Sequence, residues 1–139
     1  MGIKRTLRLG AFSLAIAASS IAMAEVPADF IKTYESEAVK TQPGFSGFSA
    51  QRGEAFFKSV HGREWSCASC HTQNPTQAGK HARTDKAIAP LAPSANSERF
   101  TSVAKVEKWF RRNCNDVAGR ACTAQEKGDV LTYLISMKK

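Results

Sequence analysis

Hydrophobic residues recur at helical spacing along much of this chain, and no stretch alternates with the period of a strand. A first helix is predicted over 27–40, and its apolar face consists of Phe30, Ile31, Tyr34 and Ala38. A second is predicted from Ala50 to about Val60, with Ser49 placed to cap it. Gly53 lies on the apolar face of this second helix, where a glycine allows another backbone to approach closely.

Two more helices are predicted nearer the C-terminus. One starts between Asn96 and Thr101 and runs to about Asn115, and its apolar positions are Val103, Val106, Phe110 and, further on, Val117. The last starts at Thr123, which forms a capping box with Glu126. The proline-containing stretch 72–96 shows no periodicity, and a loop of this length in a compact domain normally has a function. The pattern predicts an all-α domain.

The loop follows the most informative motif of the chain, Cys67-Ala68-Ser69-Cys70-His71. Two cysteines three apart, followed at once by a histidine, are typical of a site for covalent attachment of c-type haem. Cys67 and Cys70 would form thioethers with the porphyrin vinyl groups, and His71 would bind the iron from the proximal side. The pattern predicts one haem c.

Two other interpretations of the cysteine pair are weaker. A zinc site needs a second close pair of ligands, but Cys114 and Cys122 lie eight apart. A thioredoxin-like redox motif needs a surrounding strand–helix–strand pattern, which is absent from the sequence.

The N-terminal 24 residues have the features of a secretory signal peptide. A basic start precedes an apolar run from Leu9 to about Ala18, and the small residues Ala22 and Ala24 fit cleavage after Ala24. The apolar run is short for a membrane span, which needs about 20 residues. We therefore expect a signal peptide over 1–24, a cytochrome c domain over 25–139 and a periplasmic location.

Export bears on both charge and cysteine chemistry. The signal carries three basic residues and no acids, so the mature chain has a net charge of 17 − 12 = +5. This modest surplus favours a docking surface for an acidic redox partner over a nucleic-acid site. In an oxidising compartment the thiols left after haem attachment tend to pair, which predicts one disulfide between Cys114 and Cys122.

The residue that would bind the second axial position is less obvious. Met137 is the only methionine after the predicted cleavage site, but it lies two residues from the C-terminus, beyond the last predicted helix. His61 lies on the proximal side of the motif, and His81 stands among basic loop residues, where a histidine is commonly solvated. The lysines are further candidates.

Asn113 is the strongest candidate, because it completes the apolar stripe of its helix and is directed inward. The alternative is an asparagine that bonds to backbone groups or ends the helix. Its neighbour Cys114 favours the ligand role, because a disulfide to Cys122 would fix the end of the helix that presents Asn113.

With these residues the sequence resembles the SHP-type cytochromes c, a small group of class I-like haem proteins, through the motif at 67–71 and the segments 105–114 and 119–129. The resemblance implies a class I cytochrome c-like fold with crossed N- and C-terminal helices. It also implies iron ligands His71 and Asn113, a Cys114–Cys122 disulfide, and an asparagine that leaves the iron on reduction. A dihaem cytochrome c and a membrane b-type cytochrome are the electron donors that it suggests.

Three functions follow from this interpretation. The favoured one is a periplasmic monohaem cytochrome that accepts electrons and, when reduced, binds O2 or NO. The second is a plain six-coordinate electron carrier. The third is an enzyme, a small haem reductase of oxygen or nitrogen species, for which no distal proton donor is evident in the sequence.

Overall fold

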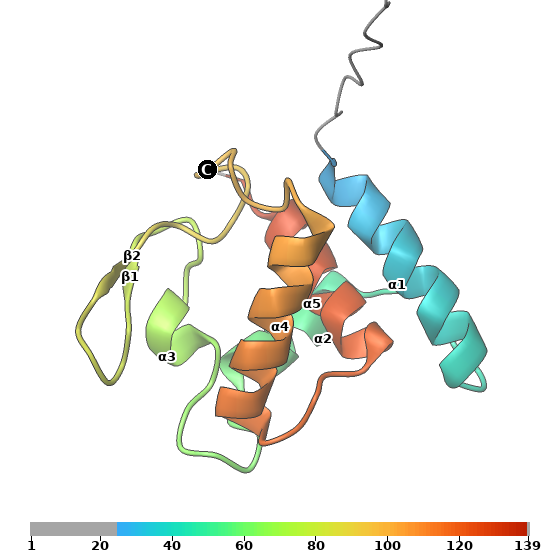
Figure 1. The fold of residues 1–139 in the computed structure, drawn as a ribbon, viewed down its shortest axis with the longest axis horizontal. Helices are drawn as coiled ribbons and strands as arrows, with labels where there is room; N and C mark the ends of the chain where they lie inside the picture. The colour runs from blue at the N-terminus through green and yellow to red at the C-terminus, as the bar shows by residue number, and fades with distance from the viewer. Residues whose placement is uncertain (1–24, 139) are drawn as a thin grey trace, which may run out of the picture.

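Residues 25–138 are described in a computed structural model of the protein, and Figure 1 shows them as a helical domain. The predicted all-α class is confirmed, although a small hairpin is present as well. The elements in chain order are α1 (Pro27–Thr41), α2 (Ala50–Lys58), α3 (Ala68–His71), β1 (Gly79–Lys80), β2 (Ala87–Ile88), α4 (Val103–Ala118) and α5 (Ala124–Ser136).

Helices α2 and α5 cross at the glycine that the sequence marked for a close approach. A Cβ atom on Gly53 would lie 1.9 Å from the carbonyl oxygen of Asp129 in α5, so only glycine permits this packing. The side chain of Asp129, itself buried, accepts hydrogen bonds from the Ser49 backbone N–H at 2.6 Å and from Arg52 Nε at 2.8 Å. The crossing of N- and C-terminal helices expected for a class I-like fold is thus present.

Helix α1 packs against α5 and α4. Phe30 and Tyr34 of α1 are buried with Leu131 of α5 and Val106 of α4 in one hydrophobic cluster. A second cluster lies around Phe57 of α2 and includes side chains of α3 and α5. The two clusters place α5 at the centre of the helical packing, with α4 passing in front of it in Figure 1.

Helix α4 begins and ends later than the sequence predicted. The expected start between Asn96 and Thr101 is wrong, because Phe100 adopts a positive φ of 56° that a right-handed helix excludes. Ser102 is the cap instead, and its side chain accepts the N–H of Lys105. The helix continues past Asn115 to Ala118 and ends at Gly119, whose φ of 68° is the left-handed conformation typical of a helix terminus.

The sequence analysis predicted no strands, and this was wrong for the loop after the haem motif. There, β1 and β2 pair antiparallel through Gly79 with Ile88 and Lys80 with Ala87. Strands of two residues are too short to produce an alternating pattern, so periodicity does not reveal them. Helix α2 also ends slightly early, at Lys58.

The predicted signal peptide, 1–24, lies outside the described residues. Within 25–138, no helix combines the length and the apolar character needed to cross a membrane.

Candidate haem site

The haem motif forms a single helical turn, α3. Cys67 is its N-terminal cap, and its carbonyl accepts the N–H of His71 at 3.0 Å and that of Cys70 at 3.3 Å. Ser66 and Ser69 bond reciprocally across the start of the turn, with N–H to Oγ distances of 3.0 and 3.2 Å. Residues three apart on a helical turn lie on the same side, which brings the two thiols to one edge of the site.

The protonation states of the motif suit covalent attachment and iron ligation. Cys67 and Cys70 are free thiols, and burial raises the pKa of Cys67 to about 11. Burial lowers the pKa of His71 to about 4, and the positive charge of Arg99 acts in the same direction. The imidazole is therefore neutral at pH 7, which is the form that binds a metal.

Apolar side chains surround the motif from several elements. The Phe57 ring of α2 lies 6.4 Å from the ring of His71, centroid to centroid. Leu91, Phe100 and Phe110 are only partly buried and pack, like Cys67, against the cluster around Phe57. Such a wall suits the apolar face of a porphyrin, so the residues present fit a haem.

The loop after the motif packs tightly onto α3. A Cβ atom on Gly79 would lie 2.0 Å from the carbonyl oxygen of Cys70, and the N–H of Ala82 points to the Cys70 sulfur at 3.3 Å. Pro75 is fully buried, and its carbonyl accepts the N–H groups of Leu91 and Ala92. The loop over 72–96 is thus held against the attachment site.

Arg99 is a site residue that the sequence analysis missed. Its Nε donates to the Pro90 carbonyl at 2.8 Å and its Nη2 to the Ala89 carbonyl at 2.7 Å. Burial lowers its pKa, and none of the carboxylates within 25–138 forms an ion pair with it. A fixed, partly buried guanidinium beside His71 is suited to bind the carboxylate of a haem propionate through charged hydrogen bonds. No local pattern marks Arg99, because its partners are backbone carbonyls that the fold brings to it.

Asn113 lies in the last half of α4, half-buried between the buried residues Val106 and Val117 of the same helix and next to the buried Cys114. Its amide has no hydrogen-bond partner among the side chains and backbone groups described here. The half-buried position on the apolar stripe of α4 suits the iron-ligand role that the sequence predicts for Asn113.

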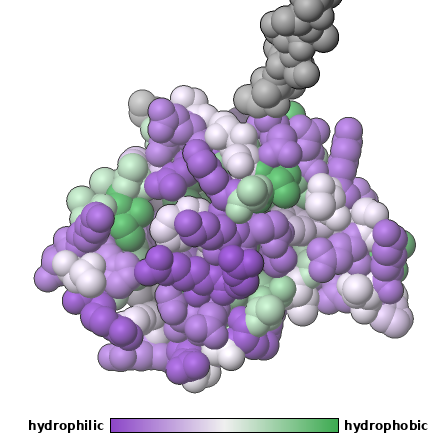
Figure 2. Space-filling model, viewed as in Figure 1, coloured by the Kyte–Doolittle hydropathy of each residue, from purple (hydrophilic) through white to green (hydrophobic). Residues whose placement is uncertain are grey.

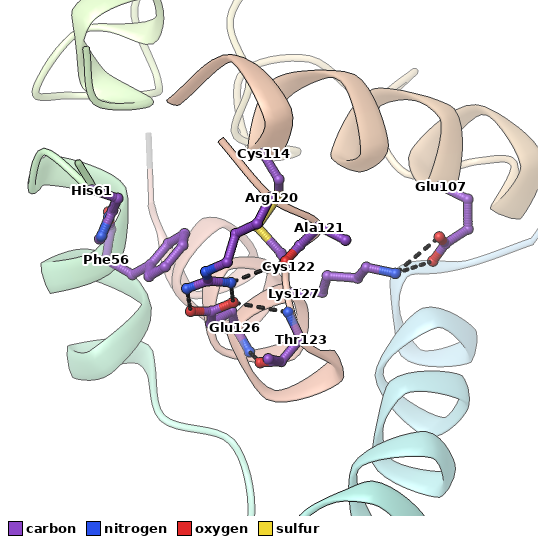
Figure 3. Close-up of a disulfide and its surroundings, with 10 residues drawn as sticks. All are labelled: Phe56, His61, Glu107, Cys114, Arg120, Ala121, Cys122, Thr123, Glu126 and Lys127. Atoms are coloured by element: carbon purple, nitrogen blue, oxygen red, sulfur yellow. Dashed lines mark hydrogen bonds and ion pairs between the residues drawn. A yellow bond between two sulfur atoms is a disulfide. The ribbon is translucent and has the colours of Figure 1, made fainter. Parts of the chain in front are cut away.

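The structure joins Cys114 and Cys122 through a disulfide, with an S–S distance of 1.91 Å and a Cα–Cα distance of 5.6 Å (Figure 3). The closed loop contains Gly119, and the capping box of α5 begins directly after it, at Thr123. Arg120 of the loop pairs with Glu126 of α5 at 2.6 Å. The C-terminal half of α4, which carries Asn113, is thereby linked covalently to the start of α5.

The other sixth-ligand candidates have local partners. His61 stacks on Phe56 with ring centroids 3.9 Å apart, and its Nε2 lies 2.6 Å from the Phe56 carbonyl oxygen. His81 accepts the N–H groups of Arg83 and Thr84 at Nδ1. Met137 follows the end of α5 and packs, partly buried, against the cluster around Phe57. None of these side chains is presented by α4.

A zinc site receives no support from the structure. Across 25–138, no three histidine, cysteine or acidic side chains are grouped so that they could hold a metal ion. The Cys67–Cys70 pair and the Cys114–Cys122 disulfide are thus separate features.

A covalent-haem motif on a short helical turn, beneath two crossed helices and an apolar wall, defines a c-type cytochrome. Residues 43–134 match the model of a family described as a domain of unknown function, DUF1924. The chain is 44% identical over 126 residues to a cytochrome c-type protein SHP of Cereibacter sphaeroides, covering 88% of this chain and 92% of that one. It is 36% identical over 135 residues to cytochrome c'' of Methylophilus methylotrophus, covering 94% of both.

Solved structures agree with these relatives. A structure of oxidised SHP, described as an oxygen-binding cytochrome c, matches with a TM-score of 0.73 over 82% of this chain and 99% of that one, at 44% identity. Crystalline oxidised cytochrome c'' from Methylophilus methylotrophus matches with a TM-score of 0.75 over 81% and 95%, at 38% identity. The chain belongs to this family of SHP-type cytochromes c, and its cofactor is one covalently bound haem c. The predicted family and cofactor are confirmed.

Proposed function

We propose that this protein accepts electrons in the periplasm and, once reduced, binds O2 or NO at the axial position that Asn113 leaves. A bound haem would supply an iron that accepts an electron and can hold a small molecule as a ligand. The periplasmic location rests on the predicted signal peptide at 1–24 and on the disulfide, which suits an oxidising compartment.

The residues of this chain have distinct roles in the proposal. Cys67 and Cys70 form the thioethers, and His71, held neutral by its surroundings, binds the proximal face. Asn113 binds the distal face in the ferric protein. Arg99 holds a propionate, because its guanidinium is fixed by the two carbonyls and lacks a carboxylate partner within the described part of the chain.

The observation that carries the proposal is the half-buried Asn113 on the apolar stripe of a helix that a disulfide holds in place. A neutral amide is a hard, weak ligand, better matched to ferric than to ferrous iron. Asn113 therefore binds in the ferric protein and is released on reduction. The open position then lies beside the apolar side chain of Phe110 on the same helix, which suits a diatomic molecule.

Two relatives support this direction. One solved relative is described as an oxygen-binding cytochrome c. The solution structure of cytochrome c'' is described as giving insight into the structural basis of haem-ligand detachment. We extend both properties to this chain as part of the proposal.

Replacement of Asn113 tests the function directly. In Asn113→Ala, we expect the ferric absorption spectrum to change, because the sixth ligand is lost. Ferric affinity for added imidazole should rise by about tenfold or more, roughly 1.4 kcal/mol, because nothing has to be displaced. Absorption spectra of both oxidation states, with and without CO and NO, give the measurement.

Asn115→Ala is the matched control, since Asn115 is an exposed asparagine of the same helix. It should leave both spectra and the imidazole affinity unchanged. An unaltered ferric spectrum in Asn113→Ala would exclude Asn113 as a ligand. A reduced wild-type protein that does not bind CO would instead indicate the plain six-coordinate carrier.

The outer face of α4 is where we place the docking site for a redox partner with an acidic surface. Lys105, Lys108, Arg111 and Arg112 are exposed on this helix, whereas Asp116 is its only exposed acid. Figure 2 shows hydrophilic residues gathered over the middle of this face, where Figure 1 places α4. The side chains of one helix span about 10–12 Å, so a partner docked here lies close to the face that carries Asn113.

A further inference from the structure

Helix α4 is held in place mainly by side chains. Within the described chain, α1 and α2 both pack closely on α5 through their backbones, whereas α4 has no comparably extensive contact with another element. The position of α4 therefore depends on its apolar side chains, above all the buried Val106, and on a few discrete links. One is the disulfide at Cys114, and another lies about two turns earlier at Glu107.

Glu107 joins α4 to two other helices. Its carboxylate accepts a hydrogen bond from the hydroxyl of Tyr34 in α1. It also accepts from Nζ of Lys127 in α5, at 3.0 Å to Oε2 and 3.3 Å to Oε1 (Figure 3). The Lys127 side chain is 14% exposed and that of Glu107 is 40% exposed, so this ion pair is partly shielded from solvent.

The aromatic ring of Tyr34 extends the same link toward the haem site. Tyr34 is 2% exposed and meets the Phe110 ring edge to face, with centroids 6.0 Å apart. Nζ of Lys127 lies 5.1 Å above the Tyr34 ring, a favourable cation–π arrangement. Tyr34 and Lys127 thus contact each other as well as the carboxylate of Glu107, which makes a geometrically defined anchor.

The two anchors bracket the proposed ligand. Glu107 lies six residues before Asn113, a rise of about 9 Å along the helix, and Cys114 follows Asn113 directly. A helix held only by the disulfide and by the apolar packing around Val106 has more freedom to rotate or tilt. With Glu107 bound to α1 and α5, both motions are restrained.

We propose that Glu107 is a positioning residue, which fixes α4 through Tyr34 and Lys127 and so keeps Asn113 directed at the iron in the ferric protein. The inference rests on the proposed function, because it takes Asn113 to be the distal ligand. In this proposal Glu107 acts through Tyr34 and Lys127 and does not itself contact the haem or the diatomic ligand.

The test compares Glu107→Gln with wild type in the assembled haem protein. We expect ferric affinity for added imidazole to rise by about tenfold, because Asn113 competes less well from a loosened helix. The midpoint potential should rise by about 59 mV, the one-electron equivalent of a tenfold loss in ferric-state preference. Tyr34→Phe, which removes only the hydroxyl, should shift both quantities in the same direction by a smaller amount.

Asp116→Asn is the control, since Asp116 is an exposed acid of the same helix. It should change neither quantity beyond the small general effect of one surface charge. If Glu107→Gln lowers the melting temperature but leaves the imidazole affinity and the potential as in wild type, Glu107 is merely structural and the inference is overturned.

A double-mutant cycle separates this inference from the proposed function. In an Asn113→Ala background, Glu107→Gln should have no further effect on imidazole affinity, because the residue that Glu107 positions is gone. A persistent effect would overturn the positioning role. If Asn113→Ala alone leaves the ferric spectrum unchanged, the proposed function fails, whereas a change there with no effect of Glu107→Gln refutes only the inference.

Discussion

Arg99 illustrates how one charge can influence the haem site at the scale of single residues. Its guanidinium is fixed by the carbonyls of Ala89 and Pro90. Burial lowers the pKa of His71, and the charge of Arg99 lowers it further, so this charge acts on the proximal ligand. The ferric site carries one more positive charge than the ferrous site. A nearby cation therefore disfavours the ferric state.

Arg99→Gln should lower the midpoint potential, because the repulsion between the guanidinium and the ferric centre is removed. Arg99→Gln should also raise the pKa of the propionate, because the propionate loses its nearby cation. The change of midpoint potential that accompanies propionate ionisation should therefore move to higher pH. Potentiometric titration between about pH 5 and 9 measures both effects across the range where perturbed carboxyl groups titrate. Lys40→Gln, an exposed cation of α1, should shift neither; equal shifts in both variants would argue against a specific role of Arg99.

At the scale of elements, the crossing of α2 and α5 depends on the absence of a side chain at Gly53. The atom that a Cβ would meet there is a backbone oxygen, which cannot move without shifting α5. Gly128 of α5 is different, because a Cβ at that position would meet the ring of Phe48, at 2.2 Å. A side chain has more freedom to turn aside than a helix backbone.

Gly53→Ala should lower the free energy of unfolding by about 2 kcal/mol or more, the usual cost of an overpacked core. Gly128→Ala should cost less, because movement of Phe48 and the better helix propensity of alanine both offset the clash. Thermal denaturation of the two haem-loaded variants tests the order. Equal losses, or a larger one for Gly128→Ala, would contradict the rigid crossing.

At the scale of the whole molecule, the distribution of charge matters more than its total. Helix α4 presents an exposed basic face, whereas its one half-buried acid, Glu107, is neutralised by Lys127. A shallow depression of about 420 Å³ lies beside this face. Three basic side chains, Lys108, Arg111 and Arg112, and one acid, Asp116, line it. A concave basic surface raises the rate of association with an acidic partner at low ionic strength.

Lys108→Gln/Arg112→Gln should slow electron transfer from reduced flavodoxin, used as an acidic probe, by about tenfold at low salt. The difference from wild type should disappear as salt screens the charges. Stopped-flow kinetics over a salt series give the measurement. The control pair Lys32→Gln/Lys40→Gln on α1 should lose far less, and an equal loss would place docking elsewhere. A small neutral reductant should reduce all variants at the same rate.

Local signals in the sequence were sufficient where the physics is local. The capping residues Ser49 and Thr123 are where the structure has them, because capping depends on residues three positions away. Gly53 was placed correctly for a similar reason, since it lies on a clear apolar face. The start of α4 was missed because the positive φ of Phe100 depends on the packing of the loop around it.

The sequence by itself determined the haem motif, the helical class and the stripe on which Asn113 lies, because covalent spacing and helical periodicity are written in neighbouring residues. Only the tertiary structure decided that Arg99 binds two loop carbonyls and that Glu107 joins α4 to Tyr34 and Lys127. Tyr34 and Glu107 are 73 residues apart in the chain. Contacts at such separation arise from how helices pack, and no local pattern encodes them.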